Sequence, residues 1–411
     1  RDLVRSRGLG DVYKRQLLGL GKYLTLHGYR DRFSILMEHL RRVSEMAKKY
    51  GFELLMWGDM FFRLAGGDYF TNFNQNPELG EIPEEVRQLV PENIHLVYWD
   101  YFSRDRQSYE RNIDAHNAIK SGSWFAGGLW TWAGFAPHNT FSIATMREAM
   151  KACHAKGVEN VVMTMWGDNG AECSKFAVLP ALFTVSQMAQ DIDDVETIHA
   201  NFEREFGIPF EDFRALDLIG TQNDSAEAIY NPEKYLLYCD PFMGQFDNRV
   251  KSGDAAGYAD CAARLSRYES HAEYGYLFRS LRALCAFLSV KADLGIRTRA
   301  AYLSGDKKAA KALCTDYDAA LERLDAFYAA YEQQWMRENK PQGFDVVDLR
   351  IGGQRQRLLH CRDRLLAYAE GQLDRIEELE EPVLDCCCEE KADGQATRAI
   401  FWHEIASANV I

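Results

Sequence analysis

Hydrophobic and polar positions alternate in blocks along the first half of the chain. Short uncharged runs, such as the residues that follow Glu159 up to Trp166, are typical of strands buried on both faces of a parallel sheet. Between these runs, apolar residues recur at helical spacing. The pattern predicts strands at 52–57, 94–99, 124–132 and 158–166, and helices at 33–50, 106–120, 142–156 and 176–190, with a short helix near 84–89.

Strands that alternate with helices predict right-handed βαβ units and therefore a parallel sheet. A complete (β/α)8 barrel takes roughly 250 residues, but only four predicted strands precede residue 190. We therefore expect an α/β fold over residues 17–190 that corresponds to the C-terminal half of a TIM (β/α)8 barrel.

Residues 191–411 are predicted to form an all-α C-terminal domain. Apolar positions at helical spacing, together with pairs of acidic and basic residues, run through 255–294, 307–338 and 353–378. The stretch 401–405, FWHEI, is too apolar for an exposed tail, so we expect it to dock on the protein. The helical domain is also a candidate surface for a homodimer.

The leader 1–16 differs in character from the rest of the chain. It is basic within an acidic protein and shows neither a helical nor a strand period. It resembles translated adapter or assembly sequence, and we exclude it from the fold. This predicts that the native N-terminal part of the protein is not included in this sequence.

Composition narrows the possible partners and cofactors. A net charge of −13 without a compensating basic stripe argues against binding to nucleic acid or to an anionic membrane. No apolar run is long enough to span a bilayer and no secretory signal opens the chain, which favours a cytoplasmic location. The ten cysteines form no CxxC pair and the histidines show no HxH or HxxxH spacing, so we expect free thiols, no metal and no cofactor.

Aromatic residues and carboxylates gather where the predicted strands end. In (β/α) barrels the chemistry lies at the carboxyl ends of the strands. Indole rings can cover the apolar C–H face of a pyranose while carboxylates accept hydrogen bonds from its hydroxyls, so these ends predict a sugar pocket. The residues concerned are Trp57 and Asp59, Tyr98 and Asp100, Trp130 and Trp132, and Trp166 and Asp168.

Two of the nearby residues have simpler interpretations. Trp124 stands at the start of a predicted strand and is expected in the core. Asp59 is an equally good candidate for a helix cap and for a sugar ligand.

Five segments in combination resemble glycoside hydrolase family 20, the β-N-acetylhexosaminidases, and within it the bacterial clade with an all-helical C-terminal domain. The segments are LLGLGKYLTLHGY, LLMWGDMFF, HLVYWDYF, GGLWTWAGFAPHN and MTMWGDNGAECS. The resemblance extends over 17–411 and implies hydrolysis of glycans that end in β-linked N-acetylglucosamine or N-acetylgalactosamine. The implied mechanism is substrate-assisted and retaining, with the acetamide oxygen of the sugar attacking C1.

The resemblance also implies roles for the residues at the strand ends. Tyr98 would hydrogen-bond the acetamide oxygen, and Asp100 and Asp168 would bind ring hydroxyls. The family often has Glu where this chain has Asp168, so the shorter side chain is a departure from its pattern. The walls of the pocket would be formed by Trp57, Trp130 and Trp166, and Trp132 is a further candidate for sugar binding.

A second departure concerns the catalytic Asp-Glu pair of the family. The pair stands shortly before the segment that matches LLGLGKYL, a place held here by Val12-Tyr13-Lys14-Arg15-Gln16. A general acid contributes about 10²–10⁴ in rate. We therefore expect this polypeptide to be inactive and its full-length parent to be a hexosaminidase.

Two other functions remain open from the sequence. One is a non-catalytic carbohydrate-binding protein with the same aromatic pocket. The other is a different (β/α)-barrel glycosidase in which Asp100 and Asp168 form the acid/base pair. A half barrel would also expose unpaired strand edges, which predicts self-association.

Overall fold

The computed structural model describes residues 18–64, 84–168, 170–220, 231–383 and 402–406. The chain divides into two compact units. The first comprises the described parts of 1–129, 142–164 and 184–191, and the second those of 130–141, 165–183 and 192–411. The leader 1–16, which includes the place where the resemblance puts the catalytic Asp-Glu pair, lies outside the described residues.

The first unit is built on a four-stranded sheet with the order β1-β2-β3-β4. All three strand pairs are parallel, with Leu54 opposite Ile94, Val97 opposite Trp124 and Phe125 opposite Val161. The strands are β1 (Leu54–Trp57), β2 (Ile94–Trp99), β3 (Trp124–Gly128) and β4 (Val161–Thr164). The predicted parallel sheet is confirmed, and it is consistent with part of an α/β barrel.

Two predicted strands end earlier than the sequence suggested. Residues 124–132 and 158–166 were expected to be strands throughout, but β3 stops at Gly128 and β4 at Thr164. Leu129 still donates to the Thr164 carbonyl at 2.9 Å. From residues 130 and 165 onward the chain makes its contacts within the second unit, so both strand ends become loops.

Two helices of the first unit, Arg32–Lys49 and Arg106–Ile119, begin at side-chain caps and bury one face. Asp31 accepts from the Ser34 amide at the start of one helix and Asp105 from the Ser108 amide at the start of another, which satisfies amides that have no partner within the helix. The helices that accompany the sheet are α2 (Lys22–His27), α3 (Arg32–Lys49), α4 (Asp59–Leu64), α6 (Glu84–Arg87), α7 (Arg106–Ile119), α8 (Asn139–Ala155) and α9 (Leu179–Met188).

The two faces of the sheet differ in exposure. The face that carries Tyr98 packs on α7, with 5.1 Å between the ring centres of Tyr98 and His116. On the opposite face Leu55 is 51%, Trp57 39% and Val162 40% exposed. Strand register places these three side chains on the same face.

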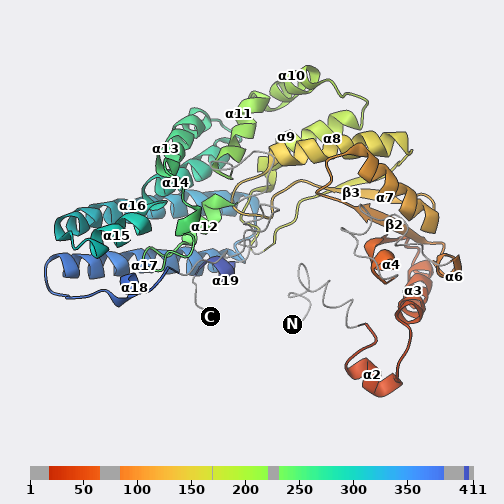
Figure 1. Ribbon diagram of the computed structural model, residues 1–411. Coiled ribbons are helices and arrows are strands. Elements are labelled where there is room, and N and C mark those ends of the chain that lie inside the picture. Colours follow the sequence, from red (N-terminus) through yellow and green to blue (C-terminus); the bar gives the residue numbers. More distant parts are fainter. Residues whose placement is uncertain (1–17, 65–83, 169, 221–230, 384–401, 407–411) are drawn as a thin grey trace. The chain divides into compact units, whose positions relative to one another are not determined.

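The second unit is helical, as predicted for the C-terminal part of the chain. Helix α14 packs against α13 and α16, and α16 packs against α17 (Figure 1). The helices are α10 (Val195–Phe206), α11 (Phe210–Arg214), α12 (Pro232–Tyr238), α13 (Asp254–Leu265), α14 (Gly275–Lys291), α15 (Leu294–Leu303), α16 (Lys307–Glu338), α17 (Phe344–Ala369), α18 (Glu377–Glu380) and α19 (Trp402–Ile405). Short 3-10 turns lie at Lys175–Val178, Ala215–Gly220, Asp247–Arg249 and Ser266–Tyr268.

The predicted helix 307–338 coincides with α16, whereas the predicted helix 353–378 is displaced toward the C-terminus. Helix α17 begins at Phe344 and ends at Ala369. Added Cβ atoms at Gly352 and Gly353 would meet no atom within 4 Å. The glycine pair is therefore a surface feature of a continuous helix and not its start.

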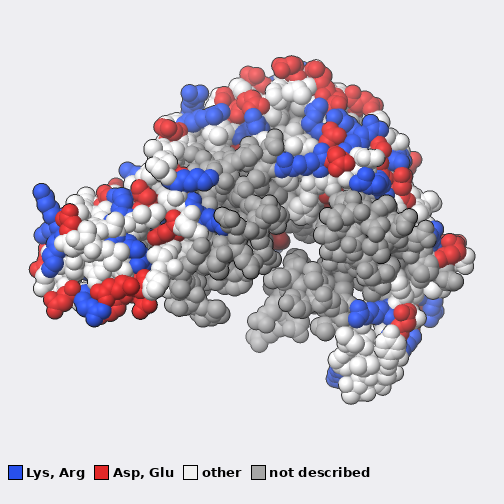
Figure 2. Space-filling view, in the orientation of Figure 1, with Lys and Arg blue, Asp and Glu red and all other residues white. Residues whose placement is uncertain are grey.

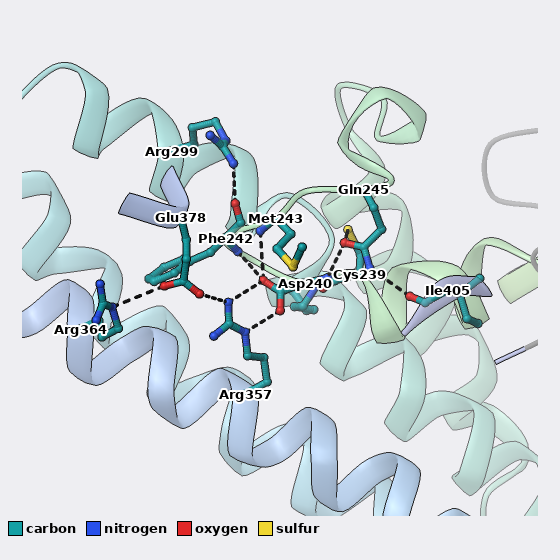
Figure 3. A network of polar contacts seen from close by, with 11 residues as sticks. Cys239, Asp240, Phe242, Met243, Gln245, Arg299, Arg357, Arg364, Glu378 and Ile405 are labelled. Carbon is teal, nitrogen blue, oxygen red and sulfur yellow. Dashed lines mark hydrogen bonds and ion pairs between the residues drawn. The ribbon is translucent and has the colours of Figure 1, made fainter. Parts of the chain in front are cut away.

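The apolar C-terminal stretch docks, as the sequence predicted, in its described part 402–405. Ile405 is fully buried, and its carbonyl accepts from Gln245 Nε2 at 3.1 Å. Figure 3 shows this contact beside a buried carboxylate, Asp240, which Arg357 binds through Nε at 2.5 Å. The same carboxylate accepts from the amides of Phe242 and Met243.

Charged side chains of both signs are interspersed over the face of the molecule that Figure 2 shows, including the helices at the far end of the helical unit. In the part of the chain that the structure describes, no helix has the length and apolar character needed to cross a membrane.

Candidate functional site

At the end of β2, Tyr98 and Asp100 form one hydrogen-bonded group. The Tyr98 hydroxyl donates to Asp100 Oδ2 at 2.8 Å, and its ring is buried against α7. The amides of Phe102 and Ser103 donate to Oδ1, and the Ser103 hydroxyl donates to Oδ2. Four donors therefore occupy the Asp100 carboxylate, which shapes the turn after the strand.

At the end of β1, Trp57 keeps 39% of its surface exposed, whereas Asp59 is buried as the first residue of α4. Between them, a Cβ on Gly58 would lie 2.3 Å from the His116 ring. Only glycine fits this position, because His116 is fully buried beneath it. That burial lowers the pKa of His116 to about 4.

The segment after β3, residues 130–138, carries two of the predicted tryptophans. The Trp130 and Trp132 rings are stacked, with centres 4.2 Å apart and planes inclined by 29°. Both are buried. The His138 amide donates to the Trp130 carbonyl at 3.1 Å, which closes the segment into a compact loop. We call residues 130–138 the tryptophan loop.

The segment after β4 exposes the ring of Trp166 to 40% and half-buries Asp168. Burial raises the pKa of the Asp168 carboxyl, while the ammonium of Lys175 opposes this shift. Lys175 Nζ donates to the Trp166 carbonyl at 2.5 Å, and Ala171 adopts a φ of 52°, a left-handed conformation that costs about 1 kcal/mol or more outside glycine. We call the described residues among 166–172 the WGD loop.

The structure joins these two loops directly. The Thr131 hydroxyl donates to the Trp166 carbonyl at 2.7 Å, and Lys175 donates to the Thr131 hydroxyl at 2.9 Å. The predicted site residues thus fall into two groups. Trp57, Tyr98 and Asp100 belong to the first unit, and Trp130, Trp132, Trp166 and Asp168 to the second.

Sequence reasoning missed a buried charged cluster beside the WGD loop. Glu172 Oε2 lies 2.5 Å from Lys234 Nζ, and Glu172 Oε1 lies 3.2 Å from Arg350 Nη1. The Tyr331 hydroxyl donates to the Glu172 carbonyl at 2.9 Å. The side chains of Glu172 and Lys234 are only 4% and 1% exposed, so the pair is shielded from solvent.

A second missed carboxylate lies next to Lys234 in the sequence. Glu233 Oε1 accepts from the amides of Phe135 and Ala136, and its side chain is fully buried. A signal was present in the sequence: an adjacent Glu-Lys pair interrupts an otherwise apolar stretch, and every residue of α12 is buried. A charged pair inside a buried helix requires specific partners.

Asp217 plays a similar part at the start of α8. Its carboxylate accepts from the amides of Asn139 and Thr140 at 3.0 and 2.8 Å. A residue distant in sequence therefore caps the helix that follows the tryptophan loop.

Among the described residues there is no cluster of His, Cys, Asp and Glu that could hold a metal ion. The seven described cysteines are buried, and they form no disulfide bonds with one another.

Comparison with known proteins identifies the helical part of the chain. Residues 209–398 match the family described as Glycoside Hydrolase 20C C-terminal domain. No curated protein gives a significant match. The matched region contains α12, α16 and α17, which supply Lys234, Tyr331 and Arg350 to the cluster at the WGD loop. The match covers the helical part of the chain and supports a member of glycoside hydrolase family 20 that carries the helical C-terminal domain of that family.

Proposed function

We propose that this chain binds the terminal N-acetylhexosamine of β-linked glycans, as part of a β-N-acetylhexosaminidase. The observation that carries the proposal is the set of tryptophans at or just after the ends of β1, β3 and β4, in a chain whose helical part matches the Glycoside Hydrolase 20C C-terminal domain. Stacked and half-exposed indoles offer the flat apolar surface that a pyranose ring needs.

The proposed roles follow from the surroundings of each residue. In the second unit Trp166 exposes ring surface that would cover the sugar, and in the first unit Trp57 is a separate candidate for stacking on a sugar ring. Trp130 and Trp132 would back the pocket as a stacked pair, and Asp168 would accept hydrogen bonds from ring hydroxyls.

Tyr98 and Asp100 fit a supporting role better than the direct contacts expected from sequence. The Tyr98 hydroxyl already donates a hydrogen bond to Asp100, and the Asp100 carboxylate already accepts four hydrogen bonds. The same saturation disfavours the alternative glycosidase that would use Asp100 and Asp168 as its acid/base pair, because a proton-transferring carboxylate needs a lone pair that faces the substrate.

For the reaction, we propose substrate-assisted hydrolysis in the complete enzyme and sugar binding without turnover in this polypeptide. Residues 12–16 contain no Asp-Glu pair, and they lie outside the described residues. The substrate-assisted mechanism needs a general acid for the leaving group.

Calorimetric titration with N-acetylglucosamine and N-acetylgalactosamine tests the binding. We expect binding of at least one of them, and Trp166→Ala should weaken it at least tenfold through lost stacking. Tyr50→Ala removes an exposed aromatic at the end of α3 and should leave the affinity unchanged. Equal loss in both variants, or no binding by the parent chain, would contradict the proposal. Release of p-nitrophenol from its N-acetylglucosaminide at the rate of a complete enzyme would contradict the absence of turnover.

A further inference from the structure

Helix α12 lies within hydrogen-bonding reach of the tryptophan loop. Glu233 Oε1 accepts from the Phe135 and Ala136 amides at 3.1 and 3.2 Å. Asn231, the residue before α12, donates through Nδ2 to the Ala133 carbonyl at 2.9 Å. Asparagine at this position ordinarily accepts from amides of its own helix, but here its side chain makes no such bond. The side chain of the N-cap residue therefore binds the tryptophan loop and does not cap its own helix.

The loop is shaped to receive this carboxylate. A Cβ on Gly134 would lie 2.3 Å from Glu233 Oε1 and 3.3 Å from the Asn231 Cβ. Any side chain at position 134 would push the carboxylate away from the amides of Phe135 and Ala136. Glycine is therefore required for contact and not for an unusual backbone angle.

The next residue of α12 binds the WGD loop. Lys234 Nζ lies 2.5 Å from Glu172, which also pairs with Arg350 of α17. Because the Lys234 and Glu172 side chains are almost fully buried, loss of Glu172 would leave the buried Lys234 ammonium without this ion-pair partner.

We propose that α12 is the element of the helical domain that positions the sugar-binding loops. Glu233 and Asn231 hold the loop that carries Trp130. Lys234 holds the loop that carries Trp166. Adjacent residues of one short helix thereby fix two loops that also bond to each other, so the aromatic surfaces are set before a sugar arrives. The link to the sugar rests on the proposed function, whereas the positioning of the loops does not.

In a folded chain, circular dichroism reports how the Trp130 and Trp132 rings are placed relative to one another. Two indoles stacked at 4.2 Å couple their transitions and give an exciton couplet, which is measured as the difference between each protein and the same protein with Trp132→Phe. Glu233→Ala should reduce this couplet strongly. Glu233→Gln keeps the Oε1 acceptor and should preserve it.

Asp240→Ala is the matched control. Asp240 is a buried carboxylate of the same unit that also accepts from two neighbouring amides, those of Phe242 and Met243 (Figure 3). Among the described residues the Asp240 carboxylate bonds to Phe242, Met243 and Arg357 and not to the tryptophan loop, so its loss should leave the couplet intact. A couplet that survives Glu233→Ala, or one that falls equally in Asp240→Ala, overturns the proposal.

Two further measurements keep the test decisive if Glu233→Ala does not fold. Gly134→Ala should reduce the couplet without altering the carboxylate itself. In the unaltered chain, hydrogen exchange of residues 130–138 should be as slow as that of 232–238. The proposal is overturned if the amides of residues 130–138 exchange rapidly while those of α12 remain protected.

Affinity for N-acetylglucosamine separates the two proposals. Misplaced loops should weaken binding about 10- to 100-fold in Glu233→Ala, with Glu233→Gln close to the parent chain. If the parent chain binds no sugar, the proposed function fails while the couplet and the exchange still decide the role of α12.

Discussion

Glu233 shows how strongly burial shapes a single residue. Burial raises the pKa of its carboxyl to about 7. The Ala136 amide and the Lys234 ammonium favour the charged form, and the nearby Glu172 carboxylate opposes it. Within the described residues, Glu233 Oε2 accepts no hydrogen bond, which leaves a place where a proton can reside.

This pKa predicts a definite pH dependence of stability. Between about pH 4.5 and 7 the folded protein holds a proton at Glu233 that the unfolded chain has released. The stabilisation is therefore complete below about pH 4.5 and is lost as pH rises through about 7. Glu233→Gln removes this dependence, so the free energy of unfolding of the variant relative to the parent should increase over this range by about 2–4 kcal/mol.

Urea unfolding of both proteins from pH 4.5 to pH 8 measures that difference. The buried His138, whose pKa burial lowers to about 4, has the opposite pH dependence but is present in both proteins and cancels. A difference that stays constant with pH would refute the assignment.

At the scale of elements, the long helices were predicted well and the strand ends were not. The 32 residues of α16 repeat a helical apolar period from end to end, so the pattern locates the helix without knowledge of its partner. The segments after Gly128 and Thr164 leave the sheet, and residues 130–141 and 165–183 make their contacts within the second unit.

The packing of α16 and α17 predicts the effect of a matched pair of substitutions. Leu324 of α16 is fully buried, whereas Leu349 of α17 is 76% exposed. Leu324→Ala should lower the free energy of unfolding by about 2–5 kcal/mol through lost burial and a cavity. Leu349→Ala should change it by no more than about 0.5 kcal/mol. Chemical denaturation measures both, and similar losses in the two variants would contradict the packing described here.

For the whole molecule, the exposed face and edge of the sheet are the features with the widest consequence. Strand β1 is at an edge of the described sheet; Phe52, just before the strand, is 65% exposed and Leu55, within it, is 51% exposed. An exposed apolar edge strand is a template for pairing with another chain. We expect this polypeptide to self-associate with rising concentration.

Sedimentation velocity checks this expectation. Leu55→Lys should shift the protein toward the monomer, since a charge on an edge strand opposes pairing. Leu349→Lys, an equal change at an exposed helix position, should not. A monomer at every concentration in the unaltered chain would show that the edge is not used in this way.

The candidate site shows where prediction from sequence reached its limit. Trp57, Trp130, Trp132 and Trp166 could be proposed from the sequence because their type and their place near strand ends are local properties. The supporting residues were not found, because Glu233 lies 98 positions from Phe135, and Tyr331 lies 159 positions from Glu172. Tyr98 was assigned to the sugar by resemblance, and only the contact with Asp100 revealed that its hydroxyl is already used.

The sequence by itself determined the alternation of strands and helices, the all-α character of the C-terminal domain and the segments that resemble glycoside hydrolase family 20. These features depend on periodicity and on short motifs, which are properties of residues close together in the sequence. Only the tertiary structure decided that α12 meets both the tryptophan loop and the WGD loop. Buried carboxylates and ammonium groups must find partners inside the protein, and which partners they find depends on how distant segments pack.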